Sequence, residues 1–237
     1  MTISDDRRRQ LESFRDTYVL EGISLELLDH ALTHRSWAFE REQRSADNER
    51  LEFLGDAVLG CLAAEYLYRV YPDSPEGELS KMKAFLVSRE ELGRRAIELH
   101  LADLLRLGHG EEASGGRKRS SILGSALEAV AGAMYMSASF STLQTFSKKY
   151  VFEPVKESLE SGEHLDFKSQ LQEYAQQQGG VLPEYRKVGQ EGPPHQRRFT
   201  VEVYLDDRLL GRGTGKRIKS AQNAAAREAC KNWMQEP

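Results

Sequence analysis

Apolar residues recur every three or four positions over most of the first 160 residues, the spacing that places them on one face of a helix. Clear examples are Leu25-Leu28-Leu32, Leu51-Leu54-Val58-Leu62 and Leu123-Leu127-Val130-Met134. Turn-rich breaks fall at residues 71–75 and 108–116, and no convincing strand pattern appears between them. The pattern therefore predicts an all-α domain over residues 5–158.

A polar stretch separates this domain from the rest of the chain. Residues 156–163 follow Pro154, contain a glycine and carry few apolar side chains. This composition favours a short flexible linker, which we place at residues 159–164, although the stretch could also be the frayed end of the preceding helix.

The periodicity after the linker is that of a mixed domain. Residues 166–178 have a helical pattern with Asp166 as a plausible N-cap. Alternating patterns predict strands over residues 183–188, 199–205 and 208–213, with a tight turn at Asp206-Asp207 between the last two. An alanine-rich helix over residues 220–234 follows. We expect a small α+β domain, in the order α-β-β-β-α, over residues 165–235.

Charge is distributed unevenly between the two predicted domains. Residues 165–237 carry 12 Lys and Arg against 9 Asp and Glu, whereas the preceding residues carry 21 against 28. The net charge of −4 for the whole chain therefore hides a mildly basic domain joined to an acidic one.

No apolar run approaches the ~20 residues that a membrane span needs, and the N-terminus lacks the apolar core of a signal peptide. Cys61 and Cys230 are too few for a disulfide framework, so we expect reduced packing residues in a cytoplasmic protein.

The acidic domain contains a run, NERLEFLGDAV at residues 48–58, that sets three carboxylates into an apolar helical pattern. Helical geometry places Glu49, Glu52 and Asp56 on one narrow face. Like charges on one face repel each other, and a divalent cation would remove that repulsion. Ligand sets made of oxygen atoms favour a hard ion such as Mg²⁺ or Mn²⁺. A solvated acidic stripe is the alternative.

The same run closely resembles the signature segment of the ribonuclease III family. The residues 75–81, PEGELSK, resemble the second acidic segment of that family. Further matches follow in the family's order and spacing at residues 105–108, 114–116, 121–123 and 127–129. The resemblance implies a homodimeric endoribonuclease that hydrolyses double-stranded RNA by metal-activated water, leaving 5′-phosphate and 3′-hydroxyl ends.

Family resemblance also assigns roles to individual acids. It implies that Glu52, Asp56 and Glu128 hold Mg²⁺, with Mn²⁺ able to substitute, and that Asp56 and Glu128 are catalytic. Glu49 and Glu76 match supporting acids at the edge of the cleavage valley.

The chain departs from the family pattern at Ser125, where an aspartate is usual three residues before the essential glutamate. A serine is a weak neutral ligand that could act through water. Two interpretations remain, an active nuclease with an adjusted site or a double-stranded-RNA-binding regulator with impaired chemistry. A structural ribonucleoprotein component is a third, and the retained acids favour the active enzyme.

The C-terminal order of elements resembles the double-stranded-RNA-binding domain. By resemblance, amide, carboxylate and imidazole side chains would meet the shallow minor grooves, and a basic loop would bridge the phosphates between them. The first group is Gln172, Glu173, Gln176 and His195, and the second is Lys216, Arg217 and Lys219. The alternative is a solvated basic turn and an ordinary loop histidine.

Three further features carry weaker expectations. Phe53 lies between the acids, and by resemblance it inserts into a pocket of a partner subunit; packing within its own domain is the alternative. His34 is expected to be a hydrogen-bonded structural histidine rather than a catalytic one. Residues 117–119, Arg-Lys-Arg, are expected to form a solvated loop, with phosphate contact as the alternative. The resemblance to the ribonuclease III family implies precursor rRNA, mRNA, tRNA and other structured transcripts as substrates.

Overall fold

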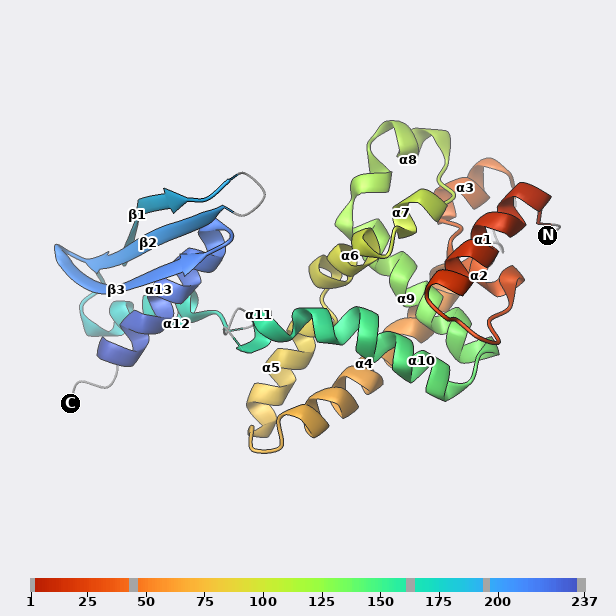
Figure 1. Ribbon diagram of the computed structural model, residues 1–237. Coiled ribbons are helices and arrows are strands. Elements are labelled where there is room, and N and C mark those ends of the chain that lie inside the picture. Colours follow the sequence, from red (N-terminus) through yellow and green to blue (C-terminus); the bar gives the residue numbers. More distant parts are fainter. Residues whose placement is uncertain (1–2, 43–46, 161–164, 194–196, 234–237) are drawn as a thin grey trace. The chain divides into compact units, whose positions relative to one another are not determined.

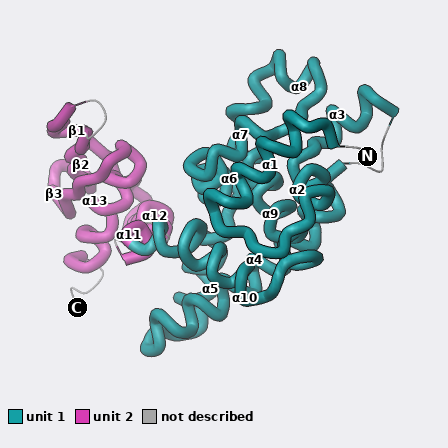
Figure 2. Tube along the Cα trace, turned by 45° about the vertical axis from the view of Figure 1, so that its right-hand side comes forward, with its two compact units in different colours: residues 1–156 teal, residues 157–237 magenta. Residues whose placement is uncertain are grey.

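The computed structural model describes residues 3–42, 47–160, 165–193 and 197–233, and it divides into two compact units at residues 156 and 157 (Figure 2). The first unit is helical and the second combines three strands with two helices, as the sequence predicts (Figure 1). None of the described helices is long and apolar enough to cross a membrane.

The first unit is built from α-helices, joined by short 3-10 and π-helical segments. Its elements are α1 (Asp5–Thr17), α2 (Leu25–Ala31), α3 (Arg35–Glu40), α4 (Glu49–Val70), α5 (Glu76–Leu86), α6 (Arg89–Glu98), α7 (Leu101–Leu104), α8 (His109–Ala113), η2 (Gly116–Lys118), α9 (Ser120–Ser137), α10 (Phe140–Phe146), η3 (Ser147–Phe152) and η4 (Glu153–Val155), and α11 (Lys156–Glu160) follows at the boundary.

Helices α4 and α9 form the centre of this unit, and α2 and α6 pack against α9. The two central helices approach so closely that glycine is required where they meet. A Cβ atom on Gly55 of α4 would overlap the carbonyl oxygen of Glu128, and one on Gly132 of α9 would overlap that of Leu51. This contact sets the distance between the acidic face of α4 and the glutamate of α9.

Two segments differ from the sequence expectation. The break predicted at residues 108–116 contains α8, because the carboxylate of Glu40 accepts hydrogen bonds from the backbone N–H groups of His109 and Gly110 at the start of that helix. The polar stretch expected to be a linker continues as helix α11 up to Glu160, with Leu159 buried. Residues 161–164 of the predicted linker lie outside the described part of the chain.

The second unit contains α12 (Phe167–Gln178), β1 (Glu184–Glu191), β2 (Arg198–Leu205), β3 (Arg208–Gly215) and α13 (Ile218–Trp233). The strands form an antiparallel sheet in the order β1-β2-β3, and α13 packs on β3 and β2. The side chain of Asp166 caps α12 by accepting from the N–H of Ser169 at 3.1 Å. Gly213 allows β3 to approach Ala225 of α13, where a Cβ atom would overlap the helix backbone.

Candidate active site and nucleic-acid interface

The acidic face of α4 begins at a buried asparagine that fixes the start of the helix. Asn48 donates from Nδ2 to the carbonyl oxygen of Ala31 and from its backbone N–H to the carbonyl oxygen of Thr33, both at 3.0 Å. These bonds join the first turn of α4 to the end of α2. The sequence pattern assigned no role to Asn48, although an asparagine directly before Glu49 is typical of the start of a helix.

Glu128 lies on α9, opposite the acids of α4, and its burial changes its chemistry. Its exposed fraction is 5%. Burial, together with the smaller effect of the negative charges of Asp56 and Glu52, raises the pKa of Glu128 from its ordinary value of 4.5 to about 7, while Arg89 acts in the opposite direction. The carboxylates of α4 and α9 therefore act on one another across the glycine contact.

Ser125, the position where the chain departs from the family pattern, contacts one of these acids. Its Oγ donates a hydrogen bond of 2.8 Å to Oε1 of Glu52. This bond joins α9 to α4 and fixes the orientation of one carboxylate. The hydroxyl thus has a direct protein partner, and its contact with a metal through water stays a prediction.

The two supporting acids lie at the ends of their helices and have separate partners. Glu49 receives an ion pair from Arg35 at 3.2 Å. Glu76 is the first residue of α5 and accepts a hydrogen bond from the hydroxyl of Ser80 at 2.7 Å. Both side chains are exposed. Among the residues that the structure describes, neither acid makes a hydrogen bond or ion pair with Glu128.

The oxygen ligands of Glu52, Asp56 and Glu128 are of the kind that binds a hard divalent cation. Carboxylate and hydroxyl oxygens are the groups that Mg²⁺ prefers, and Mg²⁺ is usually held by one or two carboxylates with several waters. In the described part of the chain, no three His, Cys, Asp or Glu side chains converge closely enough to hold a metal by themselves. Burial and the negative charges of Asp56 and Glu52 raise the pKa of Glu128, and a bound cation would favour its charged form against both effects.

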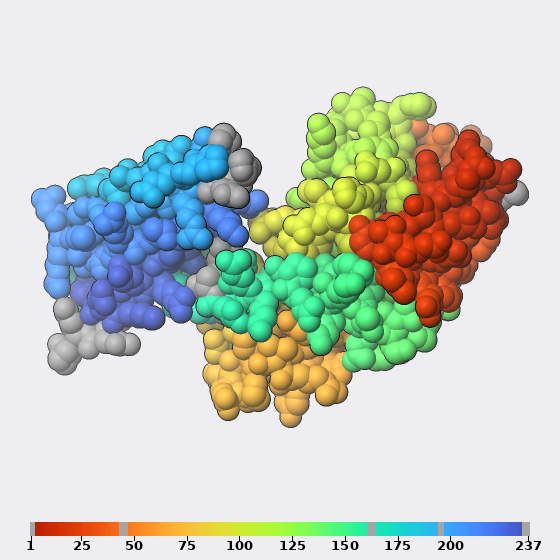
Figure 3. All heavy atoms as spheres, in the orientation of Figure 1, coloured from red at the N-terminus to blue at the C-terminus, as the bar shows by residue number. Residues whose placement is uncertain are grey.

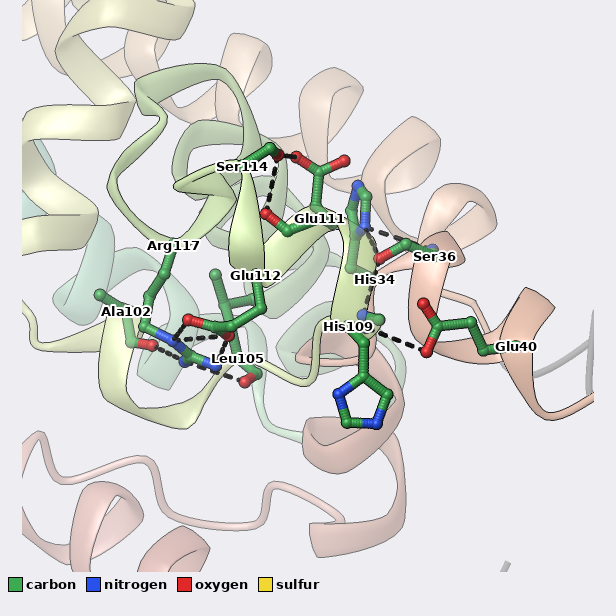
Figure 4. Close-up of polar contacts among 11 residues, drawn as sticks. His34, Ser36, Glu40, Ala102, Leu105, His109, Glu111, Glu112, Ser114 and Arg117 are labelled. Carbon is green, nitrogen blue, oxygen red and sulfur yellow. Dashed lines mark hydrogen bonds and ion pairs between the residues drawn. The ribbon is translucent and has the colours of Figure 1, made fainter.

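His34 lies in a hydrogen-bonded capping position at the start of α3 (Figure 4). Its Nδ1 accepts from the backbone N–H of Ser36 at 3.3 Å, and the hydroxyl of Ser36 accepts from the N–H of Gly108 at 2.9 Å. Burial lowers the pKa of His34, which keeps the ring neutral. Its contacts are those of a structural histidine.

A surface cavity of about 590 Å³ opens beside this capping position. Its lining includes none of the three acids that face one another across α4 and α9. The lining residues are His34, Arg35, Ser36, Phe39, Glu40, Asp47, Gly110 and Glu111. This cavity and the carboxylate face are therefore separate features of this unit.

Two arginines of the basic segment 117–119 are bound into the fold, which corrects the expectation of a solvated loop, whereas Lys118 is exposed. Arg117 pairs with Glu112 and donates from Nη1 to the carbonyl oxygens of Ala102 and Leu105 (Figure 4). Arg119 pairs with Glu111 at 2.7 Å. These contacts tie η2 to α7 and α8 in the yellow-green part of the surface (Figure 3).

In the second unit, the expected RNA-binding residues are exposed wherever they are described. Gln172, Glu173 and Gln176 lie on α12. Lys216 and Arg217 occupy the turn between β3 and α13, whereas Lys219 belongs to the first turn of α13 and not to a loop. The helix begins two residues earlier than its alanine pattern suggested. His195 lies outside the described residues.

Comparison with known families decides the relationship. Residues 24–155 match the family described as Ribonuclease-III-like, and residues 167–232 match the double-stranded RNA binding motif. The chain belongs to the ribonuclease III family. The fold class and the family expected from the sequence are both confirmed.

Individual ribonuclease III relatives resemble the chain over most of its length. It is 43% identical to Ribonuclease 3 of Moorella thermoacetica over 227 residues, covering 96% of this chain and 97% of the relative. It is 48% identical to Ribonuclease 3 of Geobacter sulfurreducens over 203 residues, covering 85% and 82% respectively.

A solved ribonuclease III structure resembles the helical part of the chain. The nuclease domain from Campylobacter jejuni is 38% identical, aligns with a TM-score of 0.55 and covers 60% of this chain and 95% of that chain. That structure is described in terms of structural flexibility in a region involved in dimer formation.

Proposed function

We propose that this chain cleaves double-stranded RNA at the carboxylate face formed by Glu52, Asp56 and Glu128. The observation that carries the proposal is the buried Glu128, whose pKa is raised to about 7 while two further carboxylates act on it from α4. Such an arrangement costs stability, and groups with strongly shifted pKa values are concentrated at functional sites. Family membership supplies the reaction, the hydrolysis of phosphodiester bonds to 5′-phosphate and 3′-hydroxyl products.

Each acid has a distinct position from which to hold Mg²⁺, or Mn²⁺ in its place. Glu128 approaches from α9, while Asp56 lies exposed on α4 where RNA can reach it. A bound divalent ion would neutralise these carboxylates, activate water and stabilise the departing oxygen. The protein's own contribution is to hold the acids at a fixed separation through the glycine contact and to exclude bulk water from Glu128.

Ser125 serves this site as an orienting group for Glu52. A hydrogen bond to an ionised carboxylate is stronger than one between neutral groups, so it fixes one rotamer of Glu52. The missing aspartate lowers the charge of the site by one but does not leave the site disorganised. This bond favours the active enzyme over the RNA-binding regulator with impaired chemistry.

The second unit holds the duplex. Exposed amide and carboxylate groups of Gln172, Glu173 and Gln176 on α12 are suited to 2′-hydroxyls of a minor groove. Lys216, Arg217 and Lys219 at the start of α13 present positive charge for phosphates. His195 would contact a second minor groove. The substrates are structured transcripts such as precursor rRNA, mRNA and tRNA.

The active form is a homodimer that meets through an apolar stripe on α4. Phe53 is 81% exposed, so it does not pack within its own unit, and Tyr68 is 74% exposed on the same helix. Ala57, Cys61 and Ala64 are also exposed and lie between them at helical spacing. Cys61 was expected to be a packing residue and is not one within this chain. A second copy would cover the stripe and place two acidic faces in one cytoplasmic enzyme, each cutting one strand.

Incubation of the full chain with long duplex RNA tests the proposal. Cleavage to short duplexes is expected with Mg²⁺ or Mn²⁺ and none with EDTA. An RNA that stays intact at every concentration of either metal while still being bound would identify the chain as a binding regulator.

A further inference from the structure

Arg89 is the first residue of α6 and lies where that helix meets α9. A Cβ atom on Gly124 would be 2.9 Å from the carbonyl oxygen of Arg89 and 3.6 Å from its Cα. Gly124 is one helical turn before Glu128 on α9. The backbone of Arg89 is therefore fixed beside the carboxylate face, and its long side chain is exposed.

The other arginines of α6 have clear structural partners. Arg94 pairs with Glu90 at 3.1 Å and with Glu91 at 3.0 Å. Arg95 pairs with Glu91 at 3.1 Å and with Glu98 at 2.7 Å. These ion pairs join neighbouring turns of the same helix.

Arg89 has no such partner among the residues that the structure describes. A positive side chain in the first turn of a helix also opposes the helix dipole, so its placement does not help α6 to form. Its charge nevertheless reaches the site, because it acts on Glu128 against the effect of burial. Neither an ion pair on α6 nor the helix dipole therefore explains an arginine at this position, and the charge that it acts on belongs to the carboxylate face.

We propose that Arg89 binds a backbone phosphate of double-stranded RNA beside the phosphodiester that is cut. The inference rests on the proposed function of the Glu52, Asp56 and Glu128 face. An acidic face repels the RNA backbone, and a guanidinium at its edge would offset that repulsion where the duplex enters. Guanidinium groups suit this task because they bind phosphate through two parallel hydrogen bonds.

The test compares full-length wild type with Arg89→Gln and Arg89→Lys. Arg9→Gln is the matched control, since it removes an exposed arginine from α1 of the same unit. A short perfectly paired RNA duplex is the probe. Single-turnover cleavage is measured with Mg²⁺, and equilibrium binding is measured with Ca²⁺ in its place over a range of monovalent salt.

Arg89→Gln is expected to lower the cleavage rate at limiting enzyme by about ten- to a hundredfold, the value of one charge-assisted hydrogen bond. The plot of log binding constant against log salt should become less steep by about 0.9, the change for one lost phosphate contact. Arg89→Lys should recover the salt slope and part of the rate, and Arg9→Gln should match wild type. The thermal midpoint should not change.

A set of duplexes with one neutral methylphosphonate at each position around the cut locates the phosphate. At one position, the methylphosphonate should weaken the binding of RNA to wild type but should not weaken its binding to Arg89→Gln any further. Equal salt slopes and equal methylphosphonate profiles for the two proteins would overturn the proposal, as would a loss of rate explained wholly by a lower thermal midpoint. A wild type that binds but never cleaves would refute the proposed function, while the binding measurements would still decide the role of Arg89.

Discussion

In both units a glycine allows two elements to pack closely, but the first unit carries negative charge at its candidate site and the second carries positive charge. In the first, Gly55 lets α4 approach α9, and in the second, Gly213 lets β3 approach α13. Around the first contact, Asp56 and Glu52 act electrostatically on the buried Glu128, whereas the second supports a surface on which Lys216, Arg217 and Lys219 are all exposed. The cleavage rate should therefore depend on the separation of α4 and α9. The affinity of the second unit for RNA should depend on ionic strength.

The largest expected effect comes from disturbing the glycine contact. Gly55→Ala should destabilise the protein by about 2–4 kcal/mol and abolish most cleavage, because the added methyl group forces α4 away from α9. The matched control is Gly60→Ala on the same helix, where a Cβ atom meets open space. Gly60→Ala should stabilise slightly, by about 0.5–1 kcal/mol.

Chemical denaturation and a cleavage assay check this pair. If both substitutions changed stability equally, the close approach of α4 and α9 would not be what holds the acidic face together.

Removing residues 160–237 should separate binding from chemistry. The remaining unit is expected to cleave poorly at physiological salt and to recover at low salt, since most phosphate-directed charge is lost and such binding weakens steeply with salt. We expect the loss of affinity to be about a hundredfold or more. Equal activity of the truncated protein at both salt concentrations would show that the first unit alone supplies the affinity.

The stability of wild type and of Glu128→Gln should depend differently on pH. The pKa of Glu128 is raised in the folded state, so its contribution to stability is complete below pH 4.5 and is lost as the pH rises through about 7. In EDTA, Glu128→Gln should therefore match wild type at pH 4.5 and exceed its stability at pH 8 by about 2–3 kcal/mol.

Urea unfolding of both proteins at several pH values measures this difference, and added Mg²⁺ should reduce it. If the difference in the free energy of unfolding between the two proteins did not vary with pH, ionisation of Glu128 would not be what destabilises the folded protein.

The smallest expected effect concerns Ser125. Ser125→Asp should lower the half-saturating Mg²⁺ concentration a few-fold while changing the saturated rate less, because ligand charge tunes the affinity for divalent ions. Ser125→Ala is the control that removes the hydrogen bond to Glu52 without adding charge, and it should raise the Mg²⁺ requirement. Cleavage titrated with Mg²⁺ compares all three, and identical curves would show that residue 125 acts on neither the metal nor Glu52.

The sequence was sufficient for the order of elements because helical and alternating periodicities are local properties. It located Asp166 as a cap, the turn at Asp206-Asp207 and the acids of α4. What it could not supply depends on contacts between distant segments. The helix α8 requires the carboxylate of Glu40, and the burial of Glu128 requires Gly55, which lies 73 residues away in the chain.

Positions at the ends of elements were the other source of error. Lys219 was placed in a loop because the alanine pattern of α13 begins only after it, whereas the helix begins at Ile218. Arg117 was expected to be solvated because its charge is visible in the sequence but its partner Glu112 and the carbonyl oxygens it binds are not predictable from spacing.

The acids between α4 and α9 are expected to carry out cleavage, while the second unit binds the duplex. Glu128→Gln separates these two roles, with Glu12→Gln on α1 as the matched control. We predict that Glu128→Gln binds duplex RNA as tightly as wild type but cleaves it more slowly by about a thousandfold or more, even in saturating Mg²⁺. Near-normal turnover by Glu128→Gln in saturating Mg²⁺ would mean that Glu128 takes no part in cleavage.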